Sequence, residues 1–301
     1  MTSLLAGLAN PINALLAALA VLTGGYVVGW SRLENGPSPG EIGVGWLTNF
    51  LDTLGIGSFA TTTSLFRAFG MVPDRIIPGT LNVGHTLPTV AEALIYTTII
   101  PVDVTTLVSM IASSVLGAWL GAGVVAKWPK RYVQIGMGFA LLAGAVLLFM
   151  KATDLLPGGG DAQGVRGIWL VVAVGGNFVL GALMSLGIGL YAPCMILVSL
   201  LGMSPTAAFP IMMGSCAFLM PVGSLKFIKE RAYNLRAALG LSIGGIPGVL
   251  IAAFIVKEMP LKYVFWLVIV VVLYTAITML YSAYSERSAV TGERSAVNAN
   301  G

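Results

Sequence analysis

Seven long apolar stretches divide the chain, and short polar connectors separate them. Six contain no Asp, Glu, Lys, Arg or His, and the seventh contains only His85 and Glu92 of these residue types. A helix that crosses about 30 Å of hydrocarbon needs roughly 20 apolar residues. The pattern therefore predicts an all-α polytopic membrane protein. The stretches are 4–30, 76–100, 104–126, 132–150, 167–225, 237–256 and 263–285.

Composition excludes most soluble classes. Only 9% of the 301 residues are charged and 57% are hydrophobic, whereas an ordinary soluble chain is about 25% charged. The net charge of +4 does not indicate nucleic acid binding, because the basic residues form short clusters between apolar stretches. Two cysteines provide neither a disulfide framework nor a zinc pattern. We expect no metal and no cofactor.

Residues 4–30 lack a basic leading region, so we expect a first transmembrane helix rather than a signal peptide.

An internal repeat organises the rest of the chain. Residues 54–60 (LGIGSFA) align with 186–192 (LGIGLYA) at an offset of 132, and 70–73 (GMVP) align with 202–205 (GMSP) at the same offset. Such a series predicts two related halves. The expected organisation is an extra N-terminal helix and connector (1–41), a first membrane repeat (42–151), a connector (152–166), a second membrane repeat (167–285) and a disordered tail (286–301).

Each half begins with an apolar segment that is interrupted at Gly-Ile-Gly. A glycine inside a helix costs about 1 kcal/mol relative to alanine, and broken segments at matching positions of two halves indicate a transporter's binding site. Close packing through small residues is the alternative explanation.

The basic residues predict how the broken segments meet the membrane, because Lys and Arg concentrate in cytoplasmic loops. If each broken segment is a re-entrant hairpin followed by three crossings, the 16 basic residues divide 12 to 4 between the two faces; if it crosses, they divide 9 to 7. The first model is favoured. It predicts seven crossings, two inverted-topology repeats, an external N-terminus and a cytoplasmic C-terminus.

These motifs resemble the sulfite exporter TauE/SafE family of membrane permeases. The resemblance covers residues 42–285 and is carried by Gly55-Ile56-Gly57, 70–73, Gly79-Thr80, Gly187-Ile188-Gly189 and 202–205, in that order. It implies a permease of the inner (cytoplasmic) membrane that moves sulfite, a sulfonate such as sulfoacetate, or a related sulfur anion, mostly as an exporter.

A small anion at the bilayer midplane needs compensating groups. The first turns of half-helices that begin near Ser58 and Leu190 leave backbone N–H groups unpaired, and glycine at 57 and 189 permits close backbone approach. Hydroxyl groups near the breaks add donors, although consecutive threonines can also bond back to their own helix. The expected substrate-binding residues are Gly57, Ser58, Thr61, Thr62, Asn82, His85, Gly189, Tyr191 and Cys194.

Ionisable residues inside the apolar stretches are candidates for coupling transport to protons or sodium. His85 and Glu92 lie seven residues apart on one helical face, which suits a proton relay; a structural polar network is the alternative. Asp52, just before the first break, is a third candidate, unless it is a helix-end residue near the surface.

The sequence therefore predicts a secondary transporter rather than an enzyme, with the lipid bilayer and a small anion as partners and a homo-oligomer left open. Permeases for sulfate, thiosulfate or a carboxylate are alternatives. So is a passive channel, and so is an intramembrane sulfur relay built on Cys194 and Cys216, although a buried cysteine usually acts as a small hydrophobe.

Overall fold

The computed structural model describes residues 36–54, 56–155, 159–187 and 189–254, together with 266, 269–270, 272–281 and 283–284. The expected first transmembrane helix within 4–30 and the expected tail 286–301 lie outside the described residues.

The described part of the chain is helical and contains no β-strand. The helices are α3 (Pro39–Thr53), α4 (Ser58–Ala68), α5 (Ile77–Ile99), α6 (Val104–Val125), α7 (Lys130–Ala152), α8 (Ile168–Met184), α9 (Tyr191–Leu200), α10 (Ala208–Lys229) and α11 (Leu235–Phe254), with short 3-10 turns η1 (Asp74–Ile76) and η2 (Pro205–Ala207).

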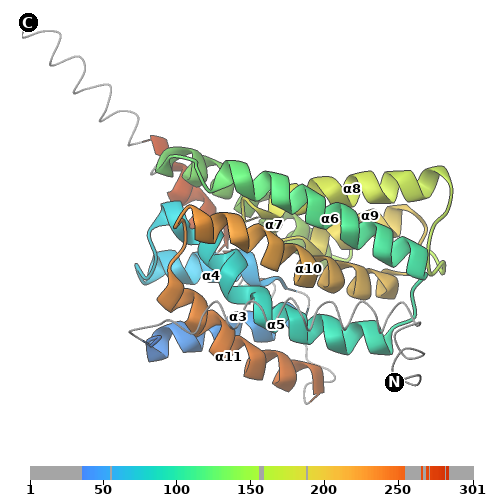
Figure 1. Ribbon diagram of the computed structural model, residues 1–301, viewed down its shortest axis with the longest axis horizontal. Helices are drawn as coiled ribbons and strands as arrows, with labels where there is room; N and C mark the ends of the chain where they lie inside the picture. Colours follow the sequence, from blue (N-terminus) through green and yellow to red (C-terminus); the bar gives the residue numbers. More distant parts are fainter. Residues whose placement is uncertain are drawn as a thin grey trace, which may run out of the picture.

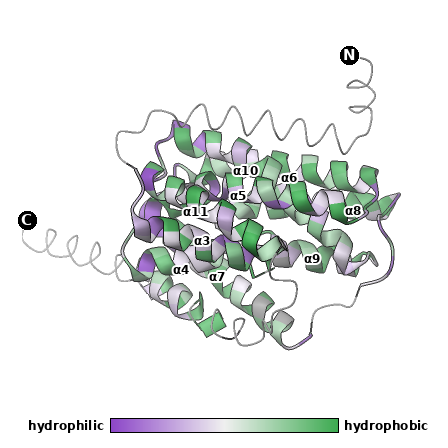
Figure 2. Ribbon diagram, turned by 90° about the horizontal axis from the view of Figure 1, so that it is seen from below, coloured by the Kyte–Doolittle hydropathy of each residue, from purple (hydrophilic) through white to green (hydrophobic). Residues whose placement is uncertain are grey.

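Three helices in the described residues are long and apolar enough to cross a membrane, namely Val104–Val125, Pro205–Lys229 and Leu235–Ala253. Large apolar side chains such as Leu116 and Leu120 of α6 point outward and are exposed. Figure 2 shows hydrophilic residues concentrated toward the two ends of the bundle. The chain is therefore a helical membrane protein. The seven crossings expected from the sequence stay a prediction.

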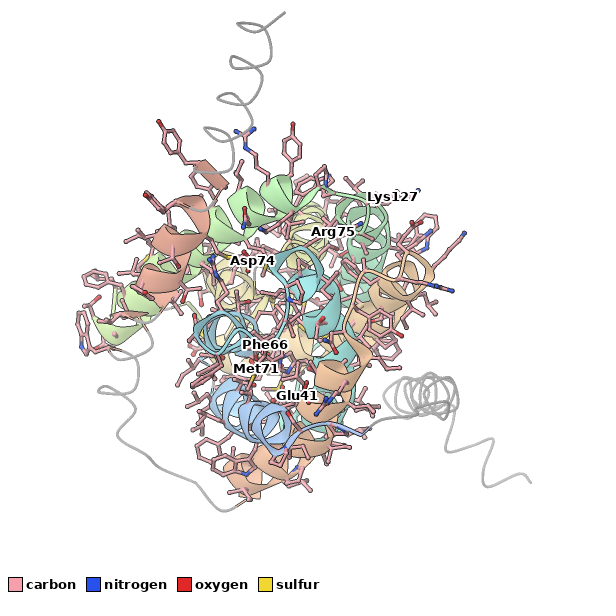
Figure 3. The ribbon with its side chains drawn as sticks, turned by 90° about the vertical axis from the view of Figure 1, so that its left-hand side faces the viewer. Glu41, Phe66, Met71, Asp74, Arg75 and Lys127 are labelled. Carbon is pink, nitrogen blue, oxygen red and sulfur yellow. The ribbon has the colours of Figure 1, made fainter. Side chains whose placement is uncertain are left out.

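One end of the bundle collects the start of α3, the end of α4 and the turn between α10 and α11 (Figures 1 and 3). Arg236 Nε lies 3.4 Å from Glu41 Oε2, and Lys127 Nζ lies 3.7 Å from Glu230 Oε1. The Asn234 N–H donates to Thr80 Oγ1 at 2.9 Å, which brings the start of α5 to the same place. We call this end the basic end.

The opposite end collects the start of α6, the connector before α8 and the end of α9. The Asp103 N–H donates to Gln163 O at 2.8 Å, and the Ser204 N–H donates to Ala162 O at 2.8 Å. Thus α3 and α4 have their outer ends at the basic end, whereas α8 and α9 have theirs at the opposite end (Figure 1).

Glycines allow two helix pairs to pack backbone against backbone. A Cβ atom at Gly117 of α6 would lie 2.0 Å from Phe178 O of α8, and one at Gly244 of α11 would lie 2.0 Å from Ile42 O of α3. The pairs α3–α11 and α6–α8 flank a central pair, α5 and α10, and α5 also contacts α11 while α10 contacts α6. Small residues here permit the close approach of helix backbones.

The repeated Gly-Met-x-Pro motif folds into the same turn in both halves. Gly70 and Gly202 have φ of +60° and +74°. After α4 the Met71 N–H donates to Phe66 O at 2.9 Å, and after α9 the Met203 N–H donates to Val198 O at 3.2 Å. Each turn satisfies carbonyl groups at a helix end and requires a residue that tolerates positive φ. The sequence likeness of the halves therefore corresponds to a likeness in local structure.

Candidate functional site between the two helix breaks

Both breaks expected from the sequence interrupt helices in the structure. The first separates Thr53 of α3 from Ser58 of α4, and Gly57 there has φ of +95°. The second separates Met184 of α8 from Tyr191 of α9, and its glycine with positive φ is Gly187, at +90°. Gly189, which the sequence analysis selected, is not among the glycines with positive φ.

A small cavity lies where the two breaks meet. Its volume is about 10 Å³, which is space for roughly one water molecule. Thr89 and Cys216, from the middle of α5 and α10, also line it, so the cavity lies about midway between the two ends of the bundle. The lining residues are Asp52, Gly57, Ser58, Phe59, Thr89, Met184, Gly189, Leu190, Tyr191 and Cys216.

The structure thus brings together Gly57, Ser58, Gly189, Tyr191 and Asp52 of the predicted residues. Five lining residues were not among the predicted site residues. Three of them are Thr89, Met184 and Cys216, and the other two are Phe59 and Leu190. At the offset of 132, Phe59 and Leu190 are the counterparts of Tyr191 and Ser58. Applying the repeat in both directions would therefore have found these two.

The other predicted substrate-binding residues do not line the cavity. The Thr61 hydroxyl donates to its own helix, 2.9 Å from Ser58 O, and the Asn82 amide nitrogen donates to Pro78 O at 2.8 Å. Cys194 is fully buried and packs in the apolar core. The Thr61 hydroxyl group therefore bonds back to its own helix, which was the alternative to a role in substrate binding.

Asp52 is buried and holds the start of α4. Its Oδ1 accepts the Ser58 N–H at 2.8 Å, and its Oδ2 accepts the Ser58 hydroxyl at 2.8 Å. A carboxylate at a helix N-terminus satisfies unpaired N–H groups and interacts favourably with the helix dipole. The alternative of a helix-end residue near the surface is wrong, because only 3% of Asp52 is exposed. The start of α9 has no side-chain cap.

Glu92 connects the two halves beside the cavity. The Tyr191 hydroxyl donates to Glu92 Oε2 at 2.5 Å, and Thr53 Oγ1 lies 2.8 Å from Glu92 Oε1. The glutamate is fully buried. One α5 side chain therefore joins the end of α3 to the start of α9.

His85 lies in a separate network. Its Nδ1 is 2.9 Å from Asn49 Oδ1, and its Nε2 is 3.0 Å from Thr62 Oγ1. Asn49 Nδ2 donates to Gly45 O at 2.7 Å, so the amide oxygen faces the ring and Nδ1 carries the hydrogen. The neutral imidazole then accepts the Thr62 hydroxyl at Nε2. Among the described residues no hydrogen bond joins His85 to Glu92, and this network ties α3, α4 and α5 together.

The cavity wall is polar without being basic. Its titratable side chains are Asp52, Tyr191 and Cys216, and neither Lys nor Arg lines it. Thr89 also lines the cavity and is 2% exposed. Three hydroxyl groups, on Ser58, Thr89 and Tyr191, therefore line the cavity. The described residues contain no group of three or more His, Cys, Asp or Glu that could hold a metal ion.

Comparison of the chain with protein-family models, with curated proteins and with solved structures found no match.

Proposed function

We propose that the protein is a secondary transporter of the inner membrane that exports a small sulfur-containing anion, such as sulfite or an organosulfonate like sulfoacetate. One observation carries the proposal: both helix breaks open onto the same buried cavity midway along the bundle. Discontinuous helices that meet at the midplane are the usual way in which transporters bind ions and small substrates. The resemblance of the repeated motifs to the TauE/SafE family supplies the class of substrate.

In this proposal the halves are inverted and each broken segment is re-entrant. The hairpin of α3 and α4 enters from the basic end, which is the cytoplasmic face, and the hairpin of α8 and α9 enters from the other face. The packing supports this, because α3 contacts α11 while its counterpart α8 contacts α6, the counterpart of α11. The exchange of partners is what a two-fold relation between halves produces.

The cavity offers groups that can bind an anion weakly enough for the anion to be released again. The start of α9 presents backbone N–H groups without a side-chain cap, and Ser58, Thr89 and Tyr191 carry hydroxyl donors. Dipoles stabilise an anion without the strong attraction of a buried Lys or Arg. A cavity of about 10 Å³ is too small for sulfite, so this conformation is closed and the breaks are the places where the helices bend.

Transport tests the proposal directly. Proteoliposomes should exchange radiolabelled sulfite or sulfoacetate faster than protein-free liposomes, and a pH gradient should alter net uptake. Sulfate and thiosulfate are the competing substrates in the same assay.

A variant with Cys194→Ser and Cys216→Ser should still transport, whereas a sulfur relay would lose all activity, since it needs a thiol and only Cys216 lines the cavity. Flux of no anion above background refutes transport, and flux that ignores the pH gradient indicates a channel.

Cysteine labelling tests the proposed topology. In the chain without native cysteines, Arg75→Cys and Arg231→Cys should react with an impermeant maleimide from the cytoplasmic side. Asp161→Cys should react only from the other side, because the connector that contains it lies at the opposite end of the bundle. The wild-type chain is the control and should stay unlabelled, since Cys194 and Cys216 are both buried. Labelling of positions 75 and 231 from different sides would rule out re-entrant hairpins.

A further inference from the structure

We propose that the Asp52 carboxylate takes the place of the transported anion in the closed state, so that the anion binds only after Asp52 has accepted a proton. This inference rests on the proposed transport function and assigns its coupling ion. It predicts that each anion moves together with one proton, so that export proceeds only when the outward anion gradient exceeds the opposing pH gradient. It also names the residue that enforces the ratio.

Asp52 uses both donors that Ser58 offers at the start of α4. The N–H and the hydroxyl group each lie 2.8 Å from one carboxylate oxygen. An oxyanion that entered the cavity would need these same donors, because they are the first free groups of the helix. Substrate and Asp52 therefore compete for Ser58.

The charges around Asp52 forbid both anions at once. Glu92 of α5, Tyr191 of α9 and Cys216 of α10 are the titratable groups that interact with Asp52 across the site. Ser58 of α4 is neutral, and Arg236 of α11 pairs with Glu41 at the basic end instead. With no cation on the cavity wall, a second negative charge beside Asp52 would be strongly unfavourable in a medium of low dielectric constant.

The proposal places a second proton on Glu92, an arrangement with which the contacts of Thr53 are consistent. Thr53 Oγ1 lies 2.9 Å from Asn49 O and 2.8 Å from Glu92 Oε1, but a hydroxyl group has one hydrogen to donate. Both contacts are satisfied when Thr53 donates to Asn49 and a protonated Glu92 donates to Thr53. The closed site then carries one negative charge, on Asp52.

Binding follows as an exchange in which charge balances. A proton from the aqueous phase forms an O–H bond on Asp52, the Ser58 N–H and hydroxyl groups turn to the entering anion, and Thr89 supplies a further donor. Thr89 lines the cavity and is 2% exposed. Release reverses each step, so the anion and the proton leave together.

Asp52→Asn tests the inference. Asparagine keeps the shape but has no charge and no proton to exchange, so any exchange of sulfite, sulfoacetate, sulfate or thiosulfate that the variant retains should no longer be coupled to protons. A pH gradient should no longer drive accumulation, which in the wild type should reach about tenfold per pH unit for a monoanion moved electroneutrally with one proton. Binding to purified wild type should take up about one proton per anion, after correction for titration of the anion itself, and binding to the variant none.

Asp103→Asn is the matched control. Asp103 also caps a helix, with Oδ1 accepting the Thr106 N–H at 2.8 Å. The pKa of Asp103 is lowered, chiefly by that hydrogen bond, and Asp103 precedes the first residue of α6 at the opposite end of the bundle. The control should keep both exchange and pH-driven accumulation.

The outcomes separate the two proposals. If the wild type exchanges none of the four anions, the transport function fails and takes this inference with it. If the wild type exchanges an anion but takes up no proton on binding it, or if Asp52→Asn still accumulates the anion from a pH gradient, only the inference is overturned. Should Asp52→Asn not fold, the proton uptake of the wild type decides alone.

Discussion

Replacing Gly57 with alanine is expected to slow anion exchange at least tenfold and to lower the stability of the protein. A Cβ atom at this position meets no other atom within 4 Å, so the substitution causes no clash. The cost comes from the backbone, since φ and ψ of +95° and +129° are open essentially to glycine alone. Such strain costs about 1–3 kcal/mol, and its relief would move Ser58 away from Asp52. Exchange in proteoliposomes and thermal unfolding in detergent measure the two effects.

Two variants at the other break separate backbone strain from the added methyl group. Gly189→Ala also adds a methyl to the cavity wall without a contact inside 4 Å, but Gly189 is not among the residues with positive φ. Gly187→Ala meets a positive φ of +90°, and its Cβ would also lie 3.0 Å from Met137 Cε, the movable end of a flexible side chain. We expect Gly187→Ala to lose activity and stability as Gly57→Ala does, and Gly189→Ala to keep most of both. Equal losses in all three variants would show that the methyl group, rather than the backbone, is responsible.

Gly117→Ala is expected to destabilise the protein by about 3 kcal/mol or more, the upper part of the range for overpacked sites. The new Cβ would lie 2.0 Å from Phe178 O, a backbone atom that cannot turn aside as a flexible side chain can. Helices α6 and α8 must then separate along their whole contact, which also includes Gly181. The measurement is the thermal unfolding midpoint in detergent, read by the loss of monodisperse protein on size-exclusion chromatography.

Gly123→Ala provides the comparison on the same helix. A Cβ atom there has open space around it, so the alanine should leave stability unchanged or raise it by up to about 1 kcal/mol through its better helix propensity. A loss at residue 123 as large as that at residue 117 would mean that any change in α6 is harmful, and the close approach of α6 to α8 would then explain nothing.

Local sequence patterns were sufficient to predict the helical class and the positions of the two helix breaks. Apolar stretches of about 20 residues predict membrane helices because the bilayer sets their length, and three helices of the described chain meet that standard. Glycine pairs and the Gly-Met-x-Pro motif predict helix ends because few other residues adopt the required φ. The sequence placed His85 and Glu92 on one helical face inside an apolar stretch, and both residues are fully buried in the structure.

What the sequence determined about this protein is therefore the set of its helices and the positions where they break. Only the tertiary structure decided which side chains meet at those breaks. Glu92 reaches Tyr191 across 99 residues, and His85 pairs with Asn49 across 36, so that Glu92 bonds to a residue that lines the cavity and His85 does not. The physical reason is that hydrogen-bond partners depend on how helices pack, which no local period encodes. The role of Asp52 also depends on tertiary structure, since its carboxylate caps α4 only because the chain turns back at Gly57.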